Sequence, residues 1–146
     1  MNNAGRSWGA PLGSFPYSAW EKVMCLNVAG VFSLTQLLIP LLEQSATSED
    51  PARVINVGSV MGEIPMGDGA YSYSASKAAV HQMTRVLAKE LAEKKITVNA
   101  LAPGPFVSNM TAFATADPKS RDKVGKNVPL GRVGSSDDIA GAVIFL

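Results

Sequence analysis

Two short β-branched runs on either side of a long helical period constrain the fold of this 146-residue chain more than any other feature. The runs Val54–Val57 and Ile96–Leu101 have the length and composition of buried strands. Between them, apolar side chains recur at three- and four-residue steps over Ser74–Lys94, which predicts a helix. A strand, a helix and a strand at this spacing form a βαβ unit with parallel strands and a right-handed crossover. We therefore expect an α/β protein with an open parallel sheet.

The remaining segments are assigned by the same patterns. Ser18–Leu42 is predicted to be a long, largely buried helix or pair of helices, with Pro40 near its end. The other expected segments are a loop over Met1–Pro16, a polar connection over Gln44–Arg53, a loop over Met61–Asp68, short helices within Phe106–Pro129, and a final helix Ile139–Leu146 that is capped by Ser135–Asp138.

Composition narrows the classes of function. The net charge of +1 and the absence of a long basic run argue against nucleic acid or an acidic membrane surface as a partner. One cysteine, Cys25, cannot form an internal disulfide and is expected to be a small buried residue in a reducing compartment. The presence of one cysteine and one histidine argues against a metal site. We expect no membrane-spanning stretch, no signal peptide and a cytoplasmic location.

Tyr73 and Lys77 are the first candidates for chemistry, because four residues on a helix place two side chains on one face. A phenol with an ordinary pKa near ~10 is a poor base at neutral pH, and an adjacent ammonium favours the phenolate. The dipole at the N-terminal end of the helix acts in the same direction. We therefore expect Lys77 to lower the pKa of Tyr73. Tyr71, six residues from Lys77, points to another side of the helix.

Ser59 is the next candidate, since it follows the strand Val54–Val57 and ligands of open α/β sheets bind beyond the carboxyl ends of the strands. There it could donate a hydrogen bond to a substrate carbonyl. The alternative is that Ser59 only caps a turn, which is the commoner role of a lone serine.

Five motifs together resemble the short-chain dehydrogenase/reductase family, in the order of that family and over nearly the whole chain. They are Asn2–Gly5, Leu26–Val28, Ser59 with Tyr73-x-x-x-Lys77, Val98–Gly104, and Pro129–Gly134 with Asp137–Ala140. Within the family the chain is most similar to 3-oxoacyl-carrier-protein reductases, and more closely to those associated with rhamnolipid synthesis.

The resemblance implies a Rossmann-type doubly wound sheet and hydride transfer between a nicotinamide cofactor and a carbonyl or secondary alcohol. It assigns Tyr73 as general acid, Ser59 as the group that polarises the substrate oxygen, Lys77 as the residue that tunes Tyr73 and binds the nicotinamide ribose, and Asn27 as the holder of a relay water. The cofactor implied is NADP, with NAD as the alternative. Its expected contacts are Asn3, Ala4, Gly5, Tyr73, Lys77, Pro103, Gly104, Phe106 and Ser108, and Met110 and Phe113 would form an apolar wall of a substrate lid.

The Gly-rich turn that holds the pyrophosphate in this family has no counterpart in the sequence. Residues 1–146 are therefore expected to form a single incomplete domain that lacks the first strands and the final strand, and to be poorly soluble alone. If longer, the protein is expected to be a homo-oligomer through the helices 18–42 and 74–94. An alternative is a catalytically inactive fragment that acts only as an interaction partner of full-length relatives.

A serine hydrolase is a further alternative. Val57 stands where a Gly-x-Ser-x-Gly elbow needs its first glycine, which weakens the match. The only histidine, His81, is expected to be a helix-surface or interface residue rather than a base.

Overall fold

The structure, a computed structural model, describes residues 1–66 and 69–146, which form two compact units, Met1–Ala102 and Pro103–Leu146. Gly67 and Asp68, the last residues of the predicted loop Met61–Asp68, lie outside the described residues. The first unit contains the two named strands and the long helices, and the second contains short helices.

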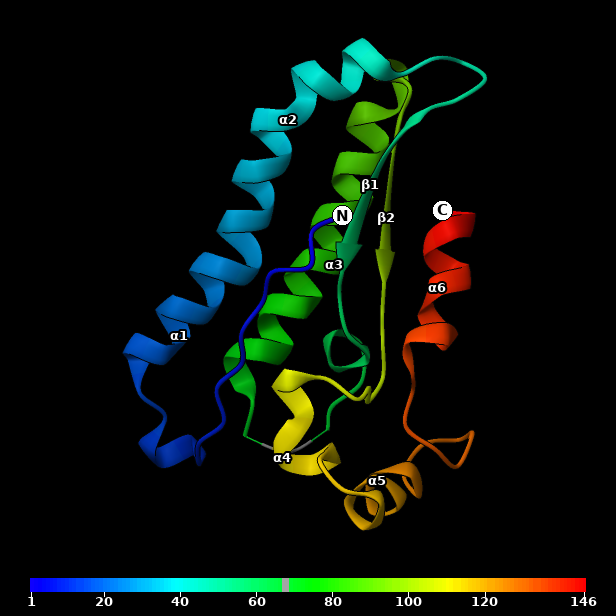
Figure 1. The fold of residues 1–146 in the computed structure, drawn as a ribbon. Helices are drawn as coiled ribbons and strands as arrows, with labels where there is room; N and C mark the ends of the chain where they lie inside the picture. The colour runs from blue at the N-terminus through cyan, green and yellow to red at the C-terminus, as the bar shows by residue number, and fades with distance from the viewer. Residues whose placement is uncertain (67–68) are drawn as a thin grey trace. The chain divides into compact units, whose positions relative to one another are not determined.

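Strands β1 (Ala52–Val57) and β2 (Ile96–Leu101) pair in parallel, with Ala52 opposite Ile96 and Val57 opposite Leu101 (Figure 1). Both predicted strands are confirmed, and β1 begins two residues earlier than expected. On the other side of β1, the Asn2 N–H donates to the carbonyl of Ile55 at 2.8 Å, and the Val57 N–H donates to the carbonyl of Asn2 at 3.0 Å. The β1 strand therefore lies between the N-terminal segment and β2, as an inner strand of a parallel sheet should.

Helix α3 (Tyr71–Leu91) connects the two strands and begins three residues before the predicted start at Ser74. The Ser74 N–H donates to the carbonyl of Ala70 at 3.0 Å, so the first helical turn already contains Tyr73. A short 3₁₀ turn, Ala92–Lys94, follows, and Lys95 ends it at a φ of 57°. The predicted βαβ connection is thus present.

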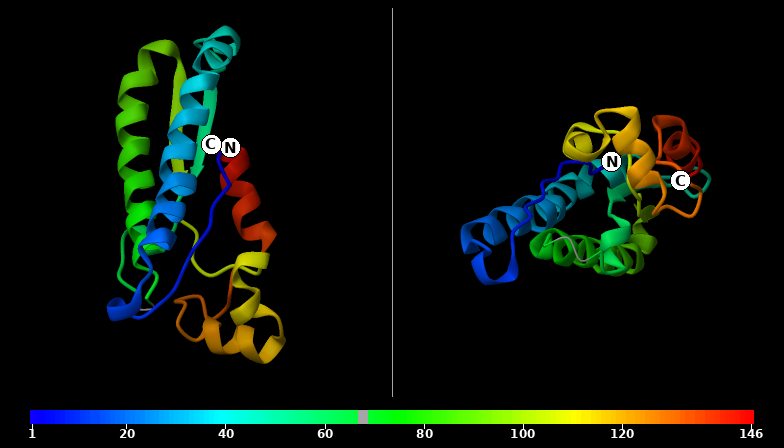
Figure 2. Two further views of the ribbon diagram at one scale, coloured as in Figure 1. Left: turned by 90° about the vertical axis from the view of Figure 1, so that its left-hand side faces the viewer. Right: turned by 90° about the horizontal axis from the view of Figure 1, so that it is seen from below.

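A helical run of three parts precedes β1: α1 (Tyr17–Met24), a π-helical segment (Cys25–Gly30) and α2 (Val31–Ser45). Two views place α2 and α3 along the same side of the strand pair (Figure 2). The core between α3 and the strands consists of Val54, Leu87, Leu91, Ile96 and Val98, with Ile39, Leu42 and Met83 packed against it.

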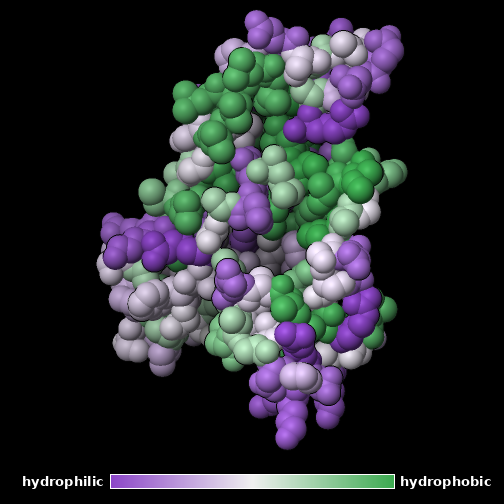
Figure 3. Space-filling view, viewed as in Figure 1, coloured by the Kyte–Doolittle hydropathy of each residue, from purple (hydrophilic) through white to green (hydrophobic). Residues whose placement is uncertain are grey.

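The expectation that the first helical run is largely buried is wrong. Its buried residues form one narrow stripe: Ala19, Val23, Asn27, Val31 and Thr35. Large apolar side chains face outward instead, and we call them the α2 apolar face: Leu26, Phe32, Leu34, Leu37, Leu38 and Leu41. Cys25 is also exposed, against expectation, because the stripe that packs inward passes through Val23 and Asn27 on either side of it. Figure 3 shows apolar surface over this part of the molecule.

The run Tyr17–Ser45 is also long and apolar enough, by length and composition alone, to cross a membrane. The expected absence of a membrane-spanning stretch stays a prediction, because length and composition alone do not establish a span. The buried polar residues Asn27 and Thr35 interrupt the apolar sequence, but the helix continues through them. A core helix of a soluble protein passes the same test of length and composition, and this run contacts α3 and β1.

The second unit contains α4 (Ala112–Thr115), α5 (Pro118–Gly125) and α6 (Ser136–Phe145), which confirms the predicted short helices and the final helix. Ser135 and Asp138 form a capping box at the start of α6. The Arg132 guanidinium donates two hydrogen bonds of 2.7 Å to the Asp138 carboxylate. These hydrogen bonds, with those from Ser135, hold the pKa of Asp138 well below its usual range, so the cap is charged at neutral pH.

Candidate active site

Three polar side chains of α3 contact the end of β1 and the residues that follow it. They are Tyr73, Lys77 and His81, at four-residue steps. Four-residue steps on a helix keep side chains on one face, and we call this set the polar face of α3. Tyr73 interacts with Ser59, Lys77 with the carbonyl of Val57, and His81 with the N–H of Ser59. The carboxyl end of β1 is therefore the place where the candidate catalytic groups of the first unit meet.

The Tyr73 phenol is half-buried and shares a hydrogen bond with the side chain of Ser59. Burial raises the pKa of Tyr73 above its ordinary value of 10, and the hydrogen bond with Ser59 lowers it part of the way back. The phenol is therefore protonated at neutral pH. A protonated phenol is a proton donor, which suits the general acid of a carbonyl reduction.

Lys77 does not act on Tyr73 as predicted. Its Nζ donates to the carbonyl of Val57 at 2.7 Å and lies 5.5 Å from the centroid of the Tyr73 ring. Burial lowers the pKa of Lys77, and the pKa of Tyr73 is raised rather than lowered. The pKa of Tyr73 is set by burial of the phenol and by its hydrogen bond with Ser59, so the predicted lowering by Lys77 is not seen.

Ser59 caps a short 3₁₀ turn, Val60–Gly62, through a 3.2 Å hydrogen bond that its Oγ accepts from the Met61 N–H. The two predicted roles are thus compatible, since the same hydroxyl also interacts with Tyr73. Gly62 allows this turn to lie directly on α3: an added Cβ would stand 2.7 Å from the backbone carbon of Lys77. Close packing of the turn against the helix fixes the serine opposite the tyrosine.

Asn27 lies in the π-helical segment and is 1 % exposed. Its Oδ1 accepts from the Arg6 N–H at 2.9 Å, and its Nδ2 donates to the Arg6 carbonyl and to Ser76 Oγ, both at 2.9 Å. Ser76 in turn donates to the carbonyl of Tyr73 at 2.7 Å. Asn27 therefore links the N-terminal segment to the helical turn that carries Tyr73. π-helical segments are frequent at functional sites, but no sequence signal here predicts one.

Gly5 lies directly beside Lys77 and Asn27. A Cβ added at Gly5 would stand 3.7 Å from Lys77 Nζ and 3.6 Å from Asn27 Oδ1. The missing side chain lets the N-terminal segment lie directly against the buried ammonium and amide, and Asn3 and Ala4 of that segment are exposed. Donors beside an open backbone suit the hydroxyl groups of a ribose.

The other four predicted cofactor residues, Pro103, Gly104, Phe106 and Ser108, belong to the second unit. There the Phe106 ring packs on Gly134, where an added Cβ would approach it to 2.6 Å. Ser108 caps the 3₁₀ turn Asn109–Thr111, and its Oγ accepts from the Thr111 N–H at 3.3 Å. Among the residues that the structure describes, none lies within 4 Å of a Cβ added at Gly104. Of the predicted lid residues, Met110 and Phe113 are exposed.

The prediction for His81 is wrong, because the residue is 6 % exposed and lies behind Ser59 rather than on the surface of the helix. Its imidazole accepts a hydrogen bond from the Ser59 N–H, with 3.3 Å between Nε2 and the amide nitrogen. The sequence signal that could have identified it is its spacing of four residues from Lys77. Among the described residues, no cluster of three metal-ligating groups occurs.

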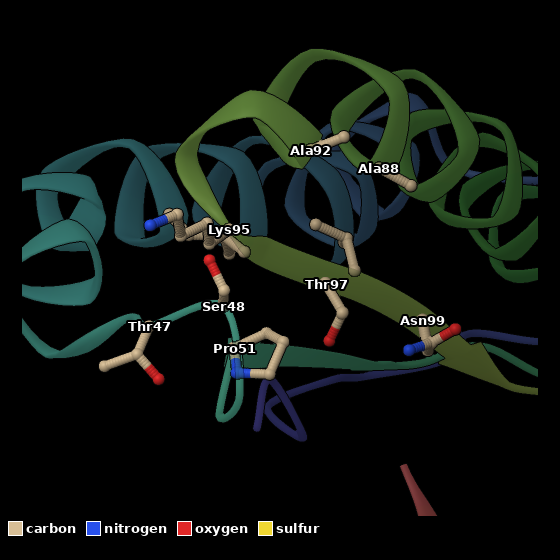
Figure 4. A pocket seen from close by; sticks show the side chains of 10 residues that line it. Thr47, Ser48, Pro51, Ala88, Ala92, Lys95, Thr97 and Asn99 are labelled. Atoms are coloured by element: carbon tan, nitrogen blue, oxygen red, sulfur yellow. The ribbon is translucent and has the colours of Figure 1, made fainter.

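A separate hollow of about 570 Å³ lies at the start of the strands, lined by residues such as Pro51, Lys95 and Thr97 (Figure 4). Lys95 is the one ionisable side chain among its lining residues, and the rest are small, aliphatic or neutral polar. The candidate catalytic residues lie at the opposite, carboxyl end of β1, so the hollow is not part of the site described above.

Comparison with known proteins gives matches over the whole chain. The family model described as enoyl-(acyl carrier protein) reductase matches residues 1–146. The rhamnolipids biosynthesis 3-oxoacyl-[acyl-carrier-protein] reductase of Pseudomonas aeruginosa is 53 % identical over 146 residues, which is all of this chain and 57 % of that protein. The 3-oxoacyl-[acyl-carrier-protein] reductase FabG of Thermotoga maritima is 37 % identical over 146 residues, all of this chain and 56 % of that protein.

Solved structures agree with these matches. The Pseudomonas aeruginosa RhlG/NADP active-site complex superimposes with a TM-score of 0.93 at 53 % identity, over 98 % of this chain and 56 % of that one. A gluconate 5-dehydrogenase from Burkholderia cenocepacia, in complex with NADP and tartrate, gives a TM-score of 0.88 at 32 % identity, over 99 % of this chain and 55 % of that one. The chain thus spans a little over half the length of the relatives that it matches.

Proposed function

Because the chain belongs to the short-chain dehydrogenase/reductase family, as the match over residues 1–146 and the 53 % identity show, we propose that it carries the catalytic residues of an oxidoreductase that reduces a carbonyl group with NADP(H). The predicted Rossmann-type α/β fold is shared with its solved relatives. The observation that supports the proposal most directly is the interaction of Tyr73 with Ser59 at the carboxyl end of β1.

In the proposed reaction the reduced nicotinamide, when bound, supplies the hydride. Ser59 donates a hydrogen bond to the substrate oxygen and holds it beside Tyr73. Tyr73 then gives its proton to the oxygen as negative charge develops there, and its raised pKa keeps this proton in place at neutral pH until it is needed. The proposal gives Asn27 a positioning role, because its hydrogen bonds end on Arg6 and Ser76.

We assign the nicotinamide ribose to Tyr73 and Lys77, beside the half-buried Gly5 and the exposed residues Asn3 and Ala4. Lys77 would have to exchange or share its bond to the carbonyl of Val57 to reach a ribose hydroxyl, which its flexible stem permits. Pro103, Gly104, Phe106 and Ser108 remain the proposed contacts of the nicotinamide ring. NADP is the proposed cofactor, because RhlG and the gluconate 5-dehydrogenase were both solved with it.

A 3-oxoacyl group on a carrier protein is the proposed substrate, on the basis of the names of the relatives at 53 % and 37 % identity. We further propose that the protein acts in the cytoplasm and that the α2 apolar face is covered by a second copy, together with the outer side of α3. Six large apolar side chains on one helical run, each at least 38 % exposed, support a protein partner at this surface.

The proposal is tested with the protein expressed at its native length, by following NADPH oxidation in the presence of a 3-oxoacyl thioester. Tyr73→Phe removes the proton donor but keeps the ring, and we expect a loss of kcat of roughly 100- to 10,000-fold, far larger than any change in affinity for NADPH, because Lys77 still binds the ribose. Tyr71→Phe is the matched control, since Tyr71 is 40 % exposed two residues away and should retain full activity.

Two results would count against the proposal. Equal losses in the two tyrosine variants would remove Tyr73 from the chemistry. A protein that binds neither NADPH nor NADH at native length would instead support the alternative of an inactive interaction partner, for which the α2 apolar face provides the surface.

A further inference from the structure

His81 contacts the backbone N–H of Ser59. The Ser59 N–H donates to Nε2 at 3.3 Å, and both groups are buried. Gly58 makes this approach possible, because a Cβ there would stand 2.0 Å from Nε2 and 2.9 Å from the carbonyl oxygen of Leu101. The imidazole thus occupies the space that any other residue at position 58 would need.

The hydrogen bond defines the protonation state of the ring. A nitrogen that accepts from an N–H must carry a lone pair, so Nε2 is unprotonated and the single proton of the neutral ring is on Nδ1. Nδ1 lies 3.3 Å from the Glu63 carboxylate, although this approach does not meet the geometry of a hydrogen bond. A second proton, on Nε2, would face the Ser59 N–H, and two donors cannot bond to each other.

The charged groups around the ring act in opposite directions. The pKa of His81 lies below its ordinary value of 6.5, first because burial disfavours the imidazolium, and Arg85 and Lys77 lower the pKa further. The Glu63 carboxylate raises it. Glu63, Arg85 and His81 together line a hollow of about 270 Å³, so the ring can exchange protons with solvent.

Two side chains of the polar face of α3 thus hold the two ends of one short segment. Lys77 binds the carbonyl of Val57, His81 binds the N–H of Ser59, and the Gly58 N–H between them donates to the carbonyl of Leu101 at 2.7 Å. Every step from the end of β1 to the catalytic serine is therefore attached to α3 or β2.

We propose that His81 is a positioning residue for Ser59: its neutral imidazole anchors the serine backbone opposite Tyr73, and protonation of the ring releases that anchor. The inference rests on the proposed function only in giving Ser59 a catalytic role. The anchor itself is a property of the first unit and can be measured without any turnover.

The direct test is NMR of the protein at native length with a pH titration. Nitrogen-15 shifts of the imidazole should show the proton on Nδ1, and the Ser59 amide resonance should titrate with the same midpoint as the ring. A proton on Nε2, or a Ser59 amide that ignores the titration of His81, would overturn the proposal. This result is obtained whether or not the protein reduces a substrate.

Activity provides the second test through two surface charges. Glu63→Gln should move the acid limb of kcat to lower pH, because the carboxylate raises the pKa of His81, and Arg85→Gln should move it to higher pH. Both residues are exposed, so both variants should fold. Limbs that stay in place, or that move in the same direction, would contradict the proposed anchor.

Substitution of the ring itself completes the design. His81→Gln offers an amide oxygen near the position of Nε2 and does not titrate, so kcat should be retained and the acid limb lost. His81→Leu leaves the buried Ser59 N–H unpaired, and we expect kcat to fall by roughly 10-fold or more at an unchanged KM for NADPH. Equal activity and equal pH profiles of the leucine variant and the parent would also overturn the proposal.

Discussion

At the scale of single residues, the same helix face combines a proton donor with two backbone anchors. Tyr73 is protonated at neutral pH, and its pKa is raised because burial outweighs the hydrogen bond with Ser59. Lys77 donates a hydrogen bond to the carbonyl of Val57, and His81 accepts one from the N–H of Ser59. The sequence spacing predicted the neighbours of Tyr73 but not their partners, since a period of four residues places side chains on a face without showing what that face meets.

The raised pKa of Tyr73 predicts different pH profiles for the two directions of the reaction. Reduction uses the phenol as an acid and should keep its rate until the pH passes about 10, whereas alcohol oxidation needs the phenolate and should still be rising there. The raised pKa of Tyr73 also affects the free energy of unfolding. It stabilises the folded protein below about pH 10, and this contribution is lost as the pH rises through the pKa of Tyr73 in the folded state. Rates in both directions between pH 7 and 11 check the first statement, and an oxidation rate that levels off near neutral pH would contradict it.

Gly58 is predicted to be the least replaceable glycine of the site. In Gly58→Ala the new methyl group would meet the imidazole of His81 at 2.0 Å, so the ring or the strand end must move. We expect a loss of about 1–3 kcal/mol in the free energy of unfolding, as for other overpacked sites. Urea denaturation measures it. Gly13→Ala is the control, because no neighbour lies within 4 Å of its added Cβ, and a loss of equal size there would point to a general effect of alanine.

At the scale of elements, the π-helical segment Cys25–Gly30 carries the buried Asn27. The sequence predicted both strands correctly from their β-branched runs. It also predicted the helical run, because the apolar periodicity of a helix persists through small changes of helical pitch. It could not predict the π-helical geometry, the burial of His81 or the exposure of Cys25. Each of these depends on which side of a helix packs against another element. A single polar or small side chain forms no periodic pattern from which that side could be predicted.

Asn27→Ala should weaken the contact between the N-terminal segment and α3. The substitution leaves the N–H and carbonyl of Arg6 without the side-chain partner that both use, and it removes the donor to Ser76. Loss of buried hydrogen-bond partners of this kind costs about 1–3 kcal/mol. Chemical denaturation measures the loss, and Asn127→Ala, at an exposed position, is the control. An undiminished free energy of unfolding in Asn27→Ala would show that water replaces the amide at no cost.

At the scale of the whole molecule, the feature that bears on assembly is the α2 apolar face. Leu37 is 75 % exposed and Leu41 is 62 % exposed, one helical turn apart. Composition alone did not predict this exposure, since an apolar helix has the same sequence pattern whether it packs in a core or against another chain. The prediction of poor solubility for the isolated chain follows from the same surface.

The double substitution Leu37→Glu/Leu41→Glu should convert an assembly of the native-length protein to monomers, because it places two charges in the proposed contact. Sedimentation velocity measures the mass, and Glu49→Gln, at an exposed position in the connection before β1, serves as a control for surface substitution. An unchanged mass would mean that the chains associate elsewhere. A parent protein that is already monomeric would mean that another partner, or a membrane, covers this face.

The four-residue steps of the polar face of α3 also limit how this protein can change over evolutionary time. A one-residue insertion between Tyr73 and His81 would turn every later side chain of the helix by about 100°, so the donor and its anchors could no longer address the same strand end. Point substitutions that retune the reaction are therefore accessible, whereas insertions and deletions within this helix remove activity and local folding together. We therefore expect members of the family to differ at this helix by substitutions, and to keep its length constant.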